Sequence, residues 1–413
     1  MLWTSDTPFT YSSLPAASSD VVTPSDKDYE EHRIRVLRLE GVSLRRRIPR
    51  CDLRIKGIQL GDNSRLDIRA LSYIHGRENQ DCEIFVNGKA FRVSQNLYDG
   101  LEVLSRDRKR WGHLWVDQIC INNADSMERS RQVKSMGEIY RRAQEVVVWL
   151  GMGLVSDHLA VDLIQRVYAE EQASGSKVDI TSDGLDILRS FIQNPYFDRL
   201  WAVQELVLGQ NITVLVGDRQ LRWDEMIAVY SKHIFYPHIS SLHESTDECT
   251  SLQRISIART QRTVLDIFDV INGFCKYSCT DARDHLFGLL GLLNDRSDGK
   301  KLALTVDYTA SLEAVLFTFC YEMLQIMPET DQLFDLLVTL AHAMGFERVF
   351  YGGCSEEEIL EFFRGAGLRS GTEIKATVRN NLQARTVQFQ EAAIFLASDE
   401  PREYDMLSGK RLL

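Results

Sequence analysis

The chain has 413 residues, of which 44% are hydrophobic and 26% are charged. This composition is typical of a folded protein with a large core, and it excludes global disorder. The formal net charge of −11 argues against binding to nucleic acid, which needs clustered Lys and Arg side chains. No apolar run reaches the roughly 18 residues of a membrane-spanning helix, and no signal-peptide pattern is present, so we expect a cytoplasmic protein.

Eight cysteines are spread along the chain and are not packed at short spacings. This distribution indicates reduced thiols and argues against a disulfide scaffold. Cys275, Cys279 and His285 lie close together in sequence, but their spacing differs from that of paired Cys-x-x-Cys zinc modules. We therefore expect no metal site.

The first elements can be predicted from composition and from local pattern. Residues 1–30 combine Ser and Pro with few apolar side chains, so we expect a disordered N-terminal arm. Apolar and polar residues alternate at 32–39 and at 66–71, as they do in strands that bury one face. Asn87-Gly88 predicts a tight β-hairpin, because both residue types accept the positive φ angles that its turn requires.

A strand, a helix and a second strand are predicted next. The mostly apolar run 114–121 is short enough for a strand buried on both faces. Asp125 with Glu128 three residues later predicts a helix that starts with a capping-box-like pattern, and an apolar stripe, which includes Tyr140, continues that helix. A run rich in residues that favour β-strands follows at 145–150. Together these elements form a βαβ unit, which predicts an α/β fold with a parallel sheet.

The remaining pattern predicts a change from mixed to helical structure. Apolar spacing of three and four dominates from about residue 250, with predicted helices at 265–274, 284–293, 312–327 and 333–343. The last seventy residues show no clear period. We therefore divide the chain into an arm at 1–30, an α/β domain at 31–230 and a mainly helical C-terminal region at 250–413.

Polar residues follow the predicted strands at the edge where parallel α/β sheets bind ligands. Because the carboxyl ends of parallel strands share one edge, we expect these loops to lie close together. Their hydroxyl, imidazole and amide groups would suit a small polar ligand such as a nucleotide. The residues are Ser72, Tyr73, His75 and Gly76 after the strand at 66–71, and Asn122 and Asn123 after the run 114–121.

Two carboxylates are further candidates. Asp117 lies inside an apolar run, where a lone carboxylate is costly, so it must be near the surface or hydrogen-bonded, for example to neighbouring backbone. Glu205 follows an aromatic-rich segment that includes Trp201, whose ring could stack on a purine or a nicotinamide. The alternative is that Glu205 pairs with an arginine such as Arg199.

Motifs for several other chemistries are missing. The sequence contains no phosphate-binding Gly-x-x-x-x-Gly-Lys-Ser/Thr loop and no Gly-x-Ser-x-Gly motif. Ser72 and His75 lie close in sequence, but the surroundings of a catalytic triad are not evident. These observations argue against a P-loop enzyme and a serine hydrolase.

The order and spacing of several motifs resemble those of fungal heterokaryon incompatibility (HET) domains. The resemblance runs from about residue 34 to residue 217. It implies a heterokaryon incompatibility factor of fungal non-self recognition, which leads to programmed cell death. It also implies action through recognition and assembly, with other incompatibility proteins or by self-association. The motifs include Leu71-Ser72-Tyr73, Val93-x-x-Asn96-Leu97, Leu114-Trp115-Val116-Asp117, Glu128-Arg129-x-x-Gln132 and Val148-Trp149-Leu150-Gly151.

HET domains are in turn distantly similar to TIR domains, which implies a TIR-like, flavodoxin-like parallel sheet. Trp201-Ala-Val-Gln-Glu205-Leu206 resembles the segment that carries the catalytic Glu of NAD-cleaving TIR enzymes. This implies an alternative function, an NAD glycohydrolase that releases nicotinamide and ADP-ribose with Glu205 as the catalytic acid. NAD would be its substrate, held by the loop residues named above together with Asp117 and Trp201. Two positions depart from the family: His75 replaces a usual Trp, and Asn123 replaces a usual Gln.

Overall fold

The computed structural model describes residues 9–14, 31–42, 48–59, 64–76, 82–236, 249–295 and 304–326, with a few single residues and short stretches besides. The chain divides into two compact units, Met1–Arg262 and Thr263–Leu413. The predicted arm at 1–30 lies outside the described residues except for 9–14.

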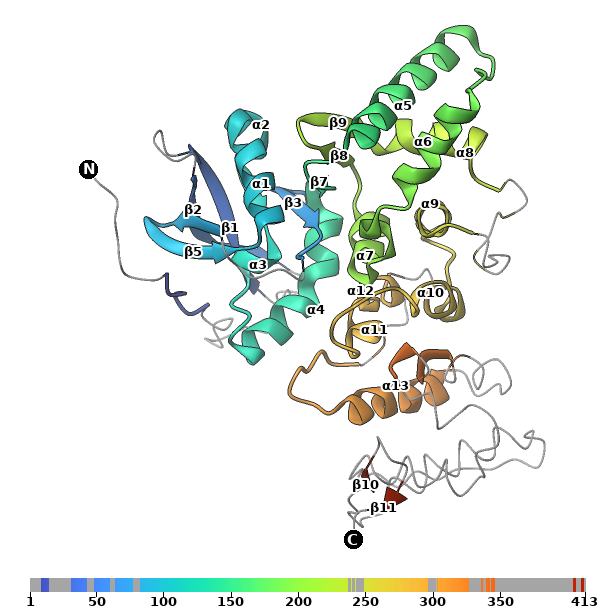
Figure 1. The fold of residues 1–413 in the computed structure, drawn as a ribbon. Helices are drawn as coiled ribbons and strands as arrows, with labels where there is room; N and C mark the ends of the chain where they lie inside the picture. The colour runs from blue at the N-terminus through green and yellow to red at the C-terminus, as the bar shows by residue number, and fades with distance from the viewer. Residues whose placement is uncertain are drawn as a thin grey trace, which may run out of the picture. The chain divides into compact units, whose positions relative to one another are not determined.

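A nine-stranded mixed sheet forms the centre of the N-terminal unit, in the order β5-β4-β2-β1-β6-β3-β7-β8-β9 (Figure 1). The neighbours β6, β3, β7 and β8 are parallel, whereas β1 pairs antiparallel with both β2 and β6. The strands are β1 (Glu31–Val42), β2 (Pro49–Gln59), β3 (Leu66–Tyr73), β4 (Cys82–Val86), β5 (Lys89–Val93), β6 (His113–Trp115), β7 (Ala143–Trp149), β8 (Ile212–Val216) and β9 (Arg219–Arg222).

The mixed pairing corrects the expected parallel sheet. Strands β1 and β2 are separated by only a short connection, and such a connection forces antiparallel pairing because a parallel crossover needs a dozen or more residues. This long hairpin lies between β4 and β6. The α/β class is confirmed, and the parallel arrangement holds for the middle of the sheet.

Helices cover this sheet and extend beyond it. Helix α4 packs on β3, β7 and α7, while α5, α6 and α8 pack together beside β8 and β9 (Figure 1). The helices are α1 (Gln95–Leu104), α2 (Arg108–Trp111), α3 (Asp117–Cys120), α4 (Ser126–Arg142), α5 (Val155–Ser174), α6 (Ser182–Ile192), α7 (Leu200–Leu208), α8 (Trp223–His233) and α9 (Ser251–Gln261), with short 3-10 turns η1 (Ser105–Asp107) and η2 (Pro195–Asp198).

Several local predictions are confirmed. Asn87 and Gly88 have φ angles of 52° and 75°, as the tight turn between β4 and β5 requires. The Asp125 carboxylate accepts hydrogen bonds from the backbone N–H groups of Met127 and Glu128, both at 3.0 Å, and so caps α4. The predicted strand at 145–150 is β7.

The predicted strand at 114–121 is wrong beyond Trp115. Residues Asp117–Cys120 form the short helix α3 instead. The Asp117 carboxylate accepts a hydrogen bond from the backbone N–H of Gln118 at 2.7 Å, and the carbonyl of Val116 accepts from Cys120 at 2.7 Å. A local side-chain bond of this kind competes with strand pairing and places Asp117 near the surface.

The described part of the C-terminal unit contains four helices and one two-stranded sheet. Predicted helix 284–293 is broken into two short helices, and most of the predicted helix 333–343 lies outside the described residues, as does most of the chain after 345. The elements are α10 (Ile267–Phe274), α11 (Asp284–Phe287), α12 (Leu290–Leu293), α13 (Leu312–Ile326) and the two-residue strands β10 (Tyr404–Asp405) and β11 (Lys410–Arg411).

Among the described helices, none combines the length and the apolar character needed to cross a bilayer. Six of the cysteines have described side chains, and all six are free thiols.

Candidate functional site

Glu205 on α7 lies in a buried polar cluster and is only 1% exposed. Its carboxylate accepts hydrogen bonds from the hydroxyls of Ser72 and of Tyr140, the latter at 3.1 Å. The Ser72 hydroxyl is also hydrogen-bonded to Tyr196. Since Ser72 has one proton and donates it to Glu205, Tyr196 is the donor in that second bond. Arg199 completes the set, with Nη1 3.8 Å from Glu205 Oε2. We call these five residues the Glu205 cluster.

Four different elements bring the Glu205 cluster together. Ser72 is near the carboxyl end of β3, and Tyr140 is in the last turn of α4, where its hydroxyl also donates to the Leu71 carbonyl at 3.2 Å. Tyr196 lies in η2, and Arg199 is the N-cap of α7. Helix α7 is buried along nearly its whole length, which explains why its carboxylate must be paired internally.

Burial dominates the electrostatics of this cluster. It raises the pKa of Glu205, and the nearby Arg199 only partly opposes this effect. Burial works to lower the pKa of Arg199, but Glu205, Tyr196, Asp117 and Tyr140 together outweigh this effect, and the pKa is raised. The Arg199 pairing that the sequence left open is therefore present. Arg199 Nη1 has no hydrogen-bond partner among the described residues.

A second pair lies beside the cluster and nearer to solvent. His75 Nε2 is 2.7 Å from Asp117 Oδ2, and their side chains are 49% and 16% exposed. The Tyr73 ring lies 4.8 Å from the His75 ring, and the Tyr73 hydroxyl donates to the Gln118 side chain at 3.1 Å. Burial works to raise the pKa of Asp117, but His75, the Gln118 N–H and Arg199 together lower it.

The other predicted residues are placed differently. The backbone N–H of Asn122 donates to Glu128 at 2.7 Å, while Asn123 and Gly76 are exposed. Trp201 is half-buried on α7. Among the described contacts, none joins Asn122 or Asn123 to the Glu205 cluster. The structure thus brings Ser72 to Glu205 and Tyr73 and His75 to Asp117, and it leaves the two asparagines apart.

Asn96 is a positioning residue that the sequence reasoning did not select. Its side-chain oxygen accepts from Trp149 Nε1 at 2.9 Å, and its amide nitrogen donates to the Ile74 carbonyl at 2.8 Å. These two bonds tie the end of β7 to the loop that carries His75. The motif Val93-x-x-Asn96-Leu97 contained the residue, but nothing in its pattern indicated these partners.

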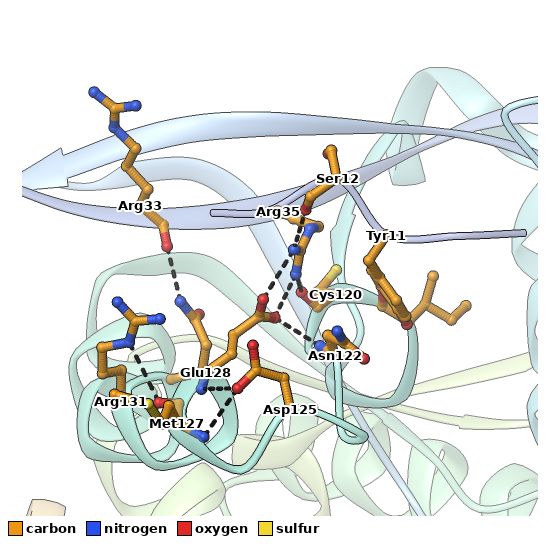
Figure 2. A network of polar contacts seen from close by, with 12 residues as sticks. Tyr11, Ser12, Arg33, Arg35, Cys120, Asn122, Asp125, Met127, Glu128 and Arg131 are labelled. Carbon is orange, nitrogen blue, oxygen red and sulfur yellow. Dashed lines mark hydrogen bonds and ion pairs between the residues drawn. The ribbon is translucent and has the colours of Figure 1, made fainter. Parts of the chain in front are cut away.

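A buried ion pair between Arg35 and Glu128 holds the loop around Asn122, as Figure 2 shows. Arg35 on β1 donates to both carboxylate oxygens of Glu128 on α4, at 2.5 and 3.0 Å. The same guanidinium donates to the carbonyls of Cys120 and Ser12 at 3.1 and 2.7 Å. Glu128 also accepts the N–H of Asn122, so it does not complete the capping box that the sequence predicted. The arrangement is structural, since both charged side chains are almost fully buried.

Within the described part of the chain, no three His, Cys, Asp or Glu side chains are grouped as a metal ion would require. Burial lowers the pKa of His285, and a hydrogen bond with the Cys275 backbone only partly opposes this effect.

Comparison with known proteins identifies the middle of the N-terminal unit. Residues 69–205 match the family model for the heterokaryon incompatibility protein (HET). This chain contains a HET domain. It is similar to heterokaryon incompatibility protein 6, OR allele, of Neurospora crassa, with 25% identity over 314 residues. The match covers 59% of this chain and 45% of that relative, so the chain spans about half of the relative's length. No solved structure matches the chain significantly.

The HET match begins in β3 and ends at Glu205. It therefore contains every member of the Glu205 cluster and the His75–Asp117 pair. Arg35, the partner of Glu128, lies outside it.

Proposed function

We propose that this chain is a heterokaryon incompatibility factor of the cytoplasm. It acts in fungal non-self recognition by recognition and assembly, with other incompatibility proteins or with further copies of itself, and its action leads to programmed cell death. The HET match and the name of the Neurospora relative support this role.

The burial of Glu205 supports assembly over catalysis. The carboxylate is 1% exposed, and the protein's own hydroxyls occupy it on both oxygens. A substrate could not contact Glu205 in this conformation. The polar cluster therefore acts as an internal support for the surface that a partner recognises.

Expression in fungal cells tests the proposal. Wild-type protein is expressed alone and together with allelic partners, beside a Glu205→Gln variant of matched abundance and melting temperature. We expect death in the incompatible combination for both proteins. Loss of killing by a folded Glu205→Gln protein would contradict assembly without catalysis.

An NAD glycohydrolase on the same fold is the second candidate. The environments of Glu205 and Asp117 push their pKa values in opposite directions, as in sites that divide acid and base roles between two carboxyl groups. Arg199 Nη1 also lacks a hydrogen-bond partner among the described residues, and a phosphate or ribose oxygen would supply one. If the cluster opened, Glu205 would orient the ribose and stabilise the developing oxocarbenium ion as nicotinamide leaves.

Direct assay separates the two candidates. Purified wild-type and Glu205→Gln proteins are incubated with NAD at high concentration, both as monomers and after clustering. Release of nicotinamide by the wild type alone would support the enzyme. No release from either protein in either form would rule it out.

A further inference from the structure

The N-terminal segment, defined as residues 9–14, packs on the sheet of the N-terminal unit. Residues 15–30 separate it from β1 in the sequence. The backbone N–H of Phe9 donates to the carbonyl of Ala90 on β5 at 3.0 Å. Strand β5 is the outermost strand at its end of the sheet. At the other end of the segment, Leu14 is buried.

Aromatic side chains anchor the segment. The Phe9 ring meets the rings of Tyr11 and Phe91 edge-on, with centroids 5.0 and 5.6 Å away. The Tyr11 hydroxyl donates to the Ile119 carbonyl at 3.1 Å, and the Arg35 guanidinium lies 4.8 Å from the Tyr11 ring centroid. One backbone bond to an edge strand, combined with side-chain anchors, is how extended peptides bind to folded domains.

The segment does not fill its groove. A hollow remains between the segment and the strands beneath it, lined by Leu53, Ile55 and Lys89 among others. Ile55 is 45% exposed. Incomplete packing forfeits part of the contact energy, which makes release of the segment easier.

We propose that the segment is exchanged between copies of the chain, so that residues 9–14 of one molecule occupy this groove on a second molecule. The contacts in the exchanged form are the same as those within one copy, so the exchange needs no new surface. Residues 15–30 could span up to about 55 Å if fully extended, enough to pass to a neighbouring molecule. The second copy is the favoured occupant because the chain's own sequence already fits the groove.

The exchange would also reach the candidate site. Tyr11 and Arg35 both bind carbonyls of α3, at Ile119 and Cys120. The same short helix carries Asp117 at its start. Occupation of the groove is therefore linked by direct contacts to the element that holds His75.

Peptide binding is the first test. A labelled peptide with the sequence of residues 7–16 is titrated against full-length wild type and full-length Tyr11→Ala, whose own segment is weakened. We expect the variant to bind the peptide at least roughly tenfold more tightly, because the tethered segment no longer competes. A peptide with Ala in place of Tyr11 should bind at least roughly tenfold more weakly than the parent. A second variant, Phe9→Ala, repeats the test if Tyr11→Ala does not fold.

Subunit exchange is the second test. Two differently tagged populations of wild type are mixed and recovered through one tag, and we expect mixed assemblies that Tyr11→Ala reduces. Absence of peptide binding to a folded variant at about 1 mM would overturn the proposal, since the segment would then be a fixed part of the fold. Peptide binding without mixed assemblies would overturn the second copy as the occupant.

This inference rests on the assembly proposed above, but the two can fail separately. Both tests use purified protein and need no killing activity. Failed exchange with intact incompatibility contradicts only the segment's role, and intact exchange without incompatibility contradicts only the proposed function.

Discussion

Arg35 and Glu128 form a two-point ion pair inside the N-terminal unit, with N–O distances of 2.5 and 3.0 Å. The pair joins the middle of β1 to the first turn of α4, which are 93 residues apart in sequence. Their side chains are 2% and 4% exposed. The Arg35 charge is thus compensated by Glu128 and by backbone carbonyls, and the Glu128 charge by Arg35 and the backbone N–H of Asn122.

Glu128→Gln should destabilise the protein strongly. The substitution leaves the Arg35 charge buried without its counter-ion, which typically costs about 3–5 kcal/mol of unfolding free energy. Urea denaturation would measure the loss. Glu102→Gln is the control, because Glu102 forms a partly exposed i,i+4 helix pair with Arg106 at 3.6 Å and its loss should cost under about 1 kcal/mol. Equal effects in the two variants would contradict the structural role of the buried pair.

Glu171 should make stability depend on pH in the acid range. Burial works to raise its pKa, but hydrogen bonds from Lys232 and His233 at 2.8 and 2.9 Å lower it from 4.5 to about 2. A lowered carboxyl pKa stabilises the fold above the unfolded value, and this stabilisation is lost as the pH falls from 4.5 towards 2. The advantage of wild type over Glu171→Gln should shrink across that window. The exposed neighbour variant Glu170→Gln should show no such change.

Glu205→Gln should show the opposite sign. The pKa of Glu205 is raised above its ordinary value of 4.5 by burial, so the folded state holds the proton more tightly than the unfolded state. Wild type therefore loses stability relative to the variant as the pH rises from 4.5 through the folded pKa. Melting temperatures of both proteins at several pH values would show this divergence. If the two melting temperatures approached each other as the pH is raised, the Arg199 charge would outweigh the effect of burial on the pKa of Glu205.

Asp117→Asn should lose a small, pH-dependent stabilisation. The pKa of Asp117 lies below 3.8 despite its burial, because His75, the Gln118 N–H and Arg199 favour the charged form. The contribution is present above pH 3.8 and disappears as the pH falls through the folded pKa. We expect under about 1 kcal/mol at neutral pH, since His75 is half-exposed and solvent screens the pair. Unfolding at pH 7 and pH 3 would test it, and a constant difference would contradict the assignment.

The sequence was sufficient to predict those elements that are determined by residues close to them in the chain. The Asn87-Gly88 turn and the Asp125 cap depend on residues within four positions, so the sequence predicted both. The place of β1 could not be predicted, since it depends on partners such as Leu114 that lie far along the chain. Glu128 failed as a capping-box residue for the same reason, because a distant arginine competes for its carboxylate.

The candidate site shows the same difference between features with local causes and features that depend on distant partners. Ser72 and His75 were selectable because they follow a predicted strand. Asp117 and Glu205 were selectable because an acid in an apolar segment needs a partner. Tyr140 was interpreted only as part of an apolar stripe, because its ring packs in the core. The apolar spacing of a helix does not indicate which group the hydroxyl contacts. The structure shows that this hydroxyl reaches Glu205 from α4.

Because of the position of β1, the part of the chain that matches the HET family is shorter than the part that the sheet needs in order to fold. The family match starts at residue 69, after both β1 and β2, yet β1 lies between β2 and β6 in the sheet. A fragment cut at that boundary would lose two inner strands, disconnect the β4–β5 hairpin and leave Glu128 buried without Arg35. It would also expose the edge of β6 to aggregation. Inactivity of such a truncated fragment would therefore report collapse of the scaffold and would carry no information about which residues perform the function.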